Sequence, residues 1–176
     1  MKTKILLATG AALVALGTFG ASHQAKAVTG DGDVDATIIQ PIDVNCTVNM
    51  DFGDIIPAVG SASTVVLTTA GVATPAGGAT HLGGEAAGEC TVSGDARAAT
   101  FDISAFTTVD DVGAGTPMTM QDFTFDYNAS AGAAPLGGAT LVPAGATLLV
   151  GATLNVGDNQ LPGAYTGSFT VEVIYD

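Results

Sequence analysis

GAYTGSFTVEVIYD, residues Gly163–Asp176, carries the pattern that decides the fold. From Ser168 onward the side chains alternate between two faces, which is typical of a half-buried β-strand. One face carries an apolar row, and its members are Phe169, Val171, Val173 and Tyr175. The sequence ends one residue after Tyr175. We therefore expect a β-sandwich whose last strand either completes the fold or lacks a neighbour, and this choice decides the function.

The first 27 residues have the features of a secretory signal peptide. Lys2 and Lys4 form a positive region, Ile5–Leu16 is an apolar core, and Ala25-Lys26-Ala27 is a small-residue cleavage site. The alternative is an uncleaved membrane anchor, but the apolar run is shorter than the roughly 20 residues that a span needs. We expect cleavage after Ala27, export of the chain, and no membrane insertion of the mature protein.

The mature chain is strongly acidic. Cleavage removes all three lysines and leaves Arg97 as the one basic residue against 17 acidic residues, a net charge of −16. Such a surface repels nucleic acid and anionic lipid, so we exclude both as partners. The acidic residues are spread along the chain, which favours a role in solubility over the capture of cations. Without lysine, the mature chain has no Schiff-base or isopeptide chemistry.

Two cysteines remain after cleavage, Cys46 and Cys90. An even number of cysteines in an exported chain indicates a disulfide. The alternative is a pair of free thiols. A disulfide between these positions would close a loop of 44 positions and, in the chain-entropy model, would stabilise the fold by roughly 4 kcal/mol.

One apolar face continues through the N-terminal part of the mature chain. Its members are even-numbered and nearly all apolar: Val34, Ala36, Ile38, Gln40, Ile42, Val44, Cys46, Val48, Met50 and Phe52. This run is much longer than an ordinary strand of about 5–6 residues. We expect two strands in one register, divided near Pro41, because proline cannot donate a hydrogen bond to a strand ladder. The first of the two would be Val34–Ile39.

The remaining sequence predicts an all-β fold. Alternating or Val/Thr-rich segments are expected as strands near residues 64–69, 90–92, 101–103, 118–127, 139–142 and 148–156, and the phase change at Asp122 indicates a β-bulge. Residues 71–88, 110–117 and 130–138 are expected as loops, the first with a loose hairpin as the alternative. No segment after the signal peptide has a sustained helical period. About eight strands at this spacing predict an antiparallel β-sandwich.

The sequence contains no recognisable catalytic, metal or cofactor motif. His81 is the only histidine of the mature chain, and no GxSxG turn accompanies it, so we expect no catalytic role. One histidine and a disulfide pair cannot supply a zinc site. GDGDVD, residues 30–35, places three carboxylates at alternate positions but lacks the glycine and glutamate that complete a calcium loop. We expect a protein that is not an enzyme and has no cofactor.

Several stretches together resemble pilin-like families that Gram-negative bacteria secrete by the chaperone–usher route, including a β-sandwich family related to the spore coat U domain. The matching pieces are Cys46 with Asp51-Phe52-Gly53, Cys90–Gly94, Met118–Met120, Val150–Gln160 and the C-terminal stretch. Chaperone–usher subunits resemble the C-terminal stretch in three features: a glycine fourteen residues from the end, alternating apolar residues and a penultimate aromatic residue. Gly163, the row from Phe169 to Val173, and Tyr175 match them.

The resemblance implies an immunoglobulin-like sandwich that lacks its last strand. A periplasmic chaperone would cover the exposed edge beside the C-terminal strand, an outer-membrane usher would export the subunit, and the N-terminal extension of another copy would then add the missing strand. Val34, Ala36 and Ile38 are the candidate donor residues. The domains would be a signal peptide at 1–27, an extension at 28–40 and a sandwich at 41–176, and the protein would form a surface fibre.

A second hypothesis is a self-sufficient secreted sandwich, either a cell-surface structural protein or a carbohydrate-binding module. In that case Val34–Ile39 would pair within its own chain. The two hypotheses differ only in whose N-terminal segment completes the C-terminal strand.

Overall fold

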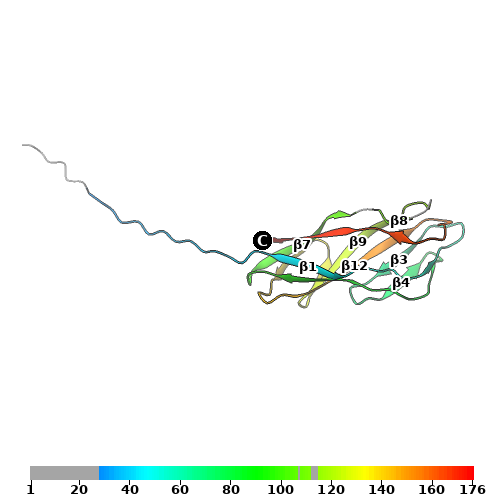
Figure 1. The fold of residues 1–176 in the computed structure, drawn as a ribbon, viewed down its shortest axis with the longest axis horizontal. Helices are drawn as coiled ribbons and strands as arrows, with labels where there is room; N and C mark the ends of the chain where they lie inside the picture. Colours follow the sequence, from blue (N-terminus) through cyan, green and yellow to red (C-terminus); the bar gives the residue numbers. More distant parts are fainter. Residues whose placement is uncertain (1–27, 107, 112–114) are drawn as a thin grey trace, which may run out of the picture. The chain divides into compact units, whose positions relative to one another are not determined.

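The computed structural model describes residues 28–106, 108–111 and 115–176, and the expected signal segment at 1–27 lies outside this range. The described residues fold into strands joined by turns, without a helix, and so contain no helix long and apolar enough to cross a membrane (Figure 1). Residues up to Ala36 and residues Thr37–Asp176 form two separate units. All strands belong to the second unit.

The larger sheet has seven antiparallel strands. β1 (Asp43–Val48), β6 (Gly88–Ser93) and β12 (Ala146–Val156) are paired in this order, and β9 (Thr119–Tyr127) also pairs with β12. β3 (Ser63–Leu67) and β4 (Ala73–Ala76) extend the sheet beside the second half of β12, and β10 (Ser130–Ala133) pairs with β9. β12 is the central strand, because its first half pairs with β6, its second half with β3, and its other side with β9.

The smaller sheet has three antiparallel strands in the order β11 (Leu136–Thr140), β7 (Ala98–Phe106) and β14 (Phe169–Tyr175). Two short ribbons complete the domain: β2 (Ile55–Ile56) with β5 (Thr80–His81), and β8 (Asp110–Asp111) with β13 (Tyr165–Thr166). In chain order, β1, β6, β7, β9, β12 and β14 have the pairing of strands A to F of an immunoglobulin sandwich, with A-B-E-D in one sheet and C-F in the other. The expected all-β sandwich is therefore confirmed.

The core lies between the two sheets. Phe101 of β7 stacks against Phe125 and Tyr127 of β9, with ring centroids 6.3 and 4.9 Å apart, and all three side chains are fully buried. The Tyr127 hydroxyl donates to the carbonyl of Val92 and accepts from the amide of Val142. Because the hydroxyl has partners for both roles, the buried phenol carries no unsatisfied polar group.

The bulge expected at Asp122 is confirmed. The register between β9 and β12 shifts between Gly151 and Thr153, and Asp122 has a φ of 50°. On the side of β12 that faces away from β9, the pairing partner changes from β6 to β3 at Gly151. A Cβ atom on Gly151 would lie 2.4 Å from the carbonyl oxygen of Leu67 and 2.9 Å from Oγ1 of Thr124. Only glycine therefore fits where the three strands meet.

Four expectations about local structure were wrong. Residues 28–42 form no strand, and β1 begins at Asp43, not at Val34. A strand needs a hydrogen-bonded partner, so the alternation of Val34–Ile39 is not sufficient by itself. Residues 130–138, expected as a loop, contain β10 and the start of β11, and residues 110–117 begin with β8. The stretch 71–88, expected as a loop or loose hairpin, contains β4 and β5.

We predict that Gly151→Ala destabilises the domain by about 1–3 kcal/mol, because the methyl group has to displace backbone atoms of β3. Urea denaturation measures the difference. Gly132→Ala is the matched control, since its Cβ would meet only the end of the Leu136 side chain, at 3.2 Å. Equal losses in the two variants would contradict the assignment of Gly151 as a close-packed position.

Candidate functional site: the free edge of strand β14

β14 is the edge strand of the smaller sheet. Its seven residues pair with β7, from Phe169 opposite Phe106 to Tyr175 opposite Ala99. Among residues 28–106, 108–111 and 115–176, no strand pairs with the other edge of β14. In a complete immunoglobulin sandwich this edge carries the last strand, G. The described domain therefore presents an edge that can accept one more strand.

The apolar row of β14 is only half-buried. Phe169, Val171, Val173 and Tyr175 pack against the core but stay partly exposed, whereas Phe101 on the neighbouring strand is fully buried. Phe169 also contacts Phe123 of the opposite sheet, with ring centroids 5.9 Å apart. The expected alternation is confirmed, and the described residues cover this row only in part.

β1, the edge strand of the larger sheet, has the same property. Val44 and Val48 share the even parity of the apolar face, yet they are 36% and 41% exposed. Val92, on the adjacent strand β6 and paired with Val44, is fully buried. The exposed apolar residues of β1 and the half-buried row of β14 therefore belong to the two sheet edges that border the position of a strand G.

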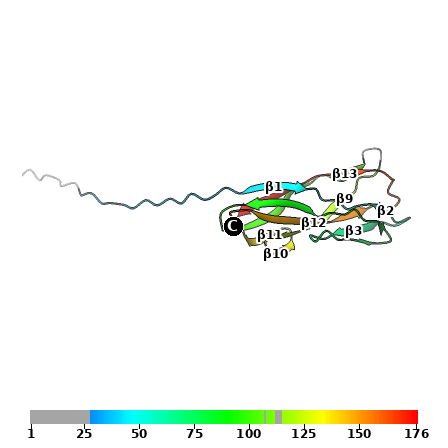
Figure 2. The same ribbon diagram turned by 60° about the horizontal axis from the view of Figure 1, so that its bottom comes forward.

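Two glycines bring these edges together. A Cβ atom on Gly88 would meet Phe169 at 3.3 Å and Met50 at 3.6 Å, so these side chains converge at one end. At the other end, a Cβ atom on Gly94 would meet the Tyr175 hydroxyl at 2.7 Å and the Ile42 side chain at 3.5 Å. β1 and β14 therefore run in opposite directions along each other, which agrees with both ribbon views (Figures 1 and 2).

Tyr175 fixes the start of β1 to the end of β14. Its hydroxyl donates to the carbonyl of Gln40 at 2.7 Å and accepts from the amide of Asp95 at 2.6 Å. The bond to Gln40 joins residues 135 positions apart in the sequence. The segment that precedes β1 therefore reaches the domain at Gln40, beside the C-terminal end of β14.

The disulfide between Cys46 and Cys90 is confirmed, and it links β1 to β6 where the two cysteines are paired across the strands. Cys90 is buried, whereas all six residues of β1 are exposed. The covalent link thus holds an edge strand that has little burial of its own.

The other predicted site residues lie elsewhere. Gly163 is in an exposed bend before β13 and is not part of the β14 edge. Val34, Ala36 and Ile38 have no strand structure, and Val34 and Ile38 are 93% and 97% exposed. The structure therefore brings together the β14 residues of the predicted set but leaves the candidate donor residues uncovered.

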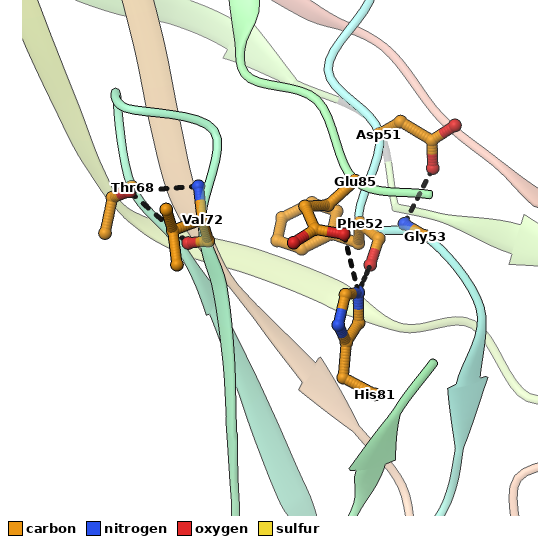
Figure 3. Close-up of polar contacts among 7 residues, drawn as sticks. All are labelled: Asp51, Phe52, Gly53, Thr68, Val72, His81 and Glu85. Atoms are coloured by element: carbon orange, nitrogen blue, oxygen red, sulfur yellow. Dashed lines mark hydrogen bonds and ion pairs between the residues drawn. The ribbon is translucent and has the colours of Figure 1, made fainter. Parts of the chain in front are cut away.

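His81 occupies a structural position at the β2–β5 ribbon (Figure 3). Its Nε2 donates to the carbonyl of Phe52 at 3.0 Å and lies 3.6 Å from Oε2 of Glu85. The imidazole is only 9% exposed, and a Cβ atom on Gly53 would lie 2.8 Å from Nε2. Both partners of Nε2, the Phe52 carbonyl and the Glu85 carboxylate, are hydrogen-bond acceptors. The position of the imidazole is therefore that of a side chain that holds Phe52 and Gly53 in place.

The described residues contain no group of three or more His, Cys, Asp or Glu side chains that could hold a metal ion. Three of the polar contacts could not have been found from sequence spacing: the bond of Tyr175 to Gln40, its bond to Asp95, and the contact of His81 with Phe52. Only the penultimate position of Tyr175 had indicated its importance.

The geometry defines an antiparallel sandwich of immunoglobulin strand order, in which no described strand pairs with the outer edge of strand F. The chain belongs to the DUF4402 family, a domain of unknown function, whose model matches residues 42–175. The match thus covers every strand that the structure describes and leaves the segment before Ile42 outside. Comparison with curated proteins and with solved structures found no significant match.

We predict that Tyr175→Phe weakens the attachment of Gln40 and of the 93–95 turn, because the ring remains while both hydrogen bonds of the hydroxyl are lost. The expected loss is about 1–2 kcal/mol of unfolding free energy. Amide hydrogen exchange at Asp95 should become faster. Tyr165→Phe is the control, since its hydroxyl bonds only Gln160 and Leu161; unchanged protection of Asp95 in Tyr175→Phe would contradict the role of the hydroxyl.

Proposed function

We propose that this protein is a structural subunit of a surface fibre, in which each copy adds a strand to the free edge of β14 in a neighbouring copy. The observation that carries the proposal is the β14 edge itself. It has no paired strand among the described residues, and two incompletely buried apolar rows border it. A strand-shaped peptide with alternating apolar residues satisfies both the backbone edge and the apolar rows.

The N-terminal extension has the composition of such a donor. Val34, Ala36 and Ile38 lie on one face of an extended chain, separated by Asp35 and Thr37. Burial of Val34 and Ile38 would each contribute about 1.5–3 kcal/mol, and the ladder hydrogen bonds would fix the register. Twelve residues, 28–39, span about 40 Å when extended, which exceeds the roughly 23 Å of β14.

The direction of the chain favours a donor from another copy. The carbonyl of Gln40 is bonded to Tyr175, so the chain's own extension starts at the C-terminal end of β14. To reach the edge of its own β14, it would have to reverse at Pro41 and run parallel to β14. A neighbour's extension has no such constraint and can enter antiparallel, the slightly more stable pairing. Repeated head-to-tail addition of this kind produces an open filament.

The same proposal includes the route of assembly. A free strand edge beside half-exposed apolar residues is prone to unspecific pairing, so we propose that a periplasmic chaperone covers it and that an outer-membrane usher passes the subunit to the cell surface. Copies of the chain or related subunits are the final partners.

We predict that a peptide with the sequence of residues 28–39 binds a mature variant that starts at Gln40 and raises its melting temperature, because binding to the folded state alone is stabilising. Calorimetric titration and thermal unfolding measure the effect. The matched control is the same peptide with Val34→Asp and Ile38→Asp, which should bind at least about tenfold more weakly, a difference of about 1.4 kcal/mol. Equal binding of the two peptides would contradict recognition by apolar donor residues.

We also predict that the mature protein, residues 28–176, forms polymers and that the variant lacking 28–39 does not. Size-exclusion chromatography with light scattering and electron microscopy separates the two. If the truncated variant polymerises as well as the mature protein, or if the mature protein remains a concentration-independent monomer with a single high-temperature transition, strand donation is wrong and the self-sufficient sandwich is correct.

A further inference from the structure

We infer that the exposed face of the β2–β5 ribbon is the surface on which the neighbouring subunit of the fibre rests, with Arg97 of that subunit at the contact. This inference rests on the proposed strand donation. We define the ribbon face by three exposed residues: Asp54, Ile56 and Leu82.

The direction of strand addition places the two copies. A donor strand antiparallel to β14 of the acceptor has residue 28 toward Tyr175 and residue 39 toward Phe169. The donor domain therefore begins, at its Gln40, beyond the Phe169 end of the acceptor. Within the donor, Gln40 is bonded to Tyr175. The Tyr175 end of the donor domain consequently faces the Phe169 end of the acceptor domain.

The connection between the two domains is short. If Ile38 of the donor aligns with Phe169 of the acceptor, Gln40 follows the last paired position by only two positions. At about 3.3 Å per residue this is roughly 7 Å of extended chain. Such a tether leaves little room between the ends of the two domains, so the surfaces there come into contact.

The β2–β5 ribbon lies at the acceptor end of this contact. Met50, which meets Phe169 at Gly88, leads directly through Phe52 into β2. The elements β2, β3, β4 and β8 lie at the end of the domain opposite the C-terminus (Figures 1 and 2). The bond from His81 to the Phe52 carbonyl joins β5 to the segment that leads into β2, and the Phe52 side chain packs against the core (Figure 3). The ribbon face is therefore preformed in the single subunit.

The ribbon face combines apolar area with one carboxylate. Ile56 and Leu82 are 51% and 64% exposed. The amide of Leu82 donates to the carbonyl of Asp54 at 2.9 Å, so these residues lie opposite each other on the two strands. Ile55 and His81, paired one position further, turn to the inner side. Two large aliphatic side chains beside a carboxylate form a surface that suits a long cationic side chain.

The Tyr175 end supplies that side chain. Arg97 is the only Lys or Arg among the described residues. Its Nε donates to Oδ2 of Asp95 at 3.2 Å, and its side chain is still 53% exposed. It lies in the turn between β6 and β7, where the amide of Asp95 bonds Tyr175 and the amide of Asp176 bonds the carbonyl of Ala98. Copies of a chain this acidic repel each other. Contact between Arg97 of the donor copy and Asp54 of the acceptor copy offsets part of that repulsion where the two copies are closest.

The first test uses the mature protein with Leu82→Glu and Ile56→Glu together. Because both side chains are exposed, the variant should fold and should bind the peptide of residues 28–39 with unchanged affinity. Its rate of polymerisation should fall at least about tenfold, because a charge replaces apolar contact between like-charged copies. Val72→Glu is the matched control. Val72 is 52% exposed but lies in the turn between β3 and β4, which follows Leu67, the partner of Ala152 in the middle of β12 and away from the end of the domain.

The second test reverses charges. Arg97→Glu and Asp54→Lys should each slow polymerisation, and the double variant should recover at least half of the original rate. Normal polymerisation of the Leu82 and Ile56 variant, or no recovery in the double variant, would overturn the contact while leaving strand donation intact. Failure of the unmodified protein to polymerise or to bind the peptide would overturn both proposals.

Discussion

The unpaired edge of β14 is the constraint on which the rest of the structure depends. A sheet edge offers backbone donors and acceptors that need partners, and the two sheets of a sandwich need side chains between their borders. Side chains fill the space between the two sheets at both ends of the β14 edge. Gly88 lets Met50 approach Phe169 at one end, and Gly94 lets Ile42 approach Tyr175 at the other. Between these ends the apolar residues of β1 and β14 remain partly in water. The described fold is thus closed at both ends of this border and open to solvent between them.

The two ends of the domain differ, and one of them is defined by a single long-range hydrogen bond. Because the Tyr175 hydroxyl donates to the carbonyl of Gln40, the residues that lead into β1 and the end of β14 meet at one corner of the domain. The same corner contains the Asp95 amide and Arg97, while the His81 contact organises the opposite end of the domain. One end of the domain is therefore built around a penultimate tyrosine and the other around a buried imidazole. This asymmetry gives a head-to-tail order to any assembly that uses the β14 edge.

Sequence reasoning succeeded where a local pattern was sufficient and failed where tertiary contacts decided. The alternation from Phe169 to Tyr175, the phase change at Asp122 and the pairing of Cys46 with Cys90 could all be read directly from residue order. β10 and the start of β11 were missed because Ser130–Gly138 is rich in Gly and Ala, whose weak strand propensity is overridden by pairing with β9 and β7. Val34–Ile39 has a good strand pattern but no strand, since a pattern does not supply a partner. The bonds of Tyr175 and His81 have no signature in the spacing of their residues.

The disulfide has a mechanical consequence. Tension applied to residues 28–39 enters the domain at Gln40 and passes into β1, an edge strand whose six residues are all exposed. Peeling a strand from an edge breaks its hydrogen bonds one at a time and needs little force. The Cys46–Cys90 bond stops such peeling after the first residues of β1 and transfers the load to β6 and, through it, to the central strand β12. A domain held in this way can stretch only at its margin, whereas its core stays folded under load.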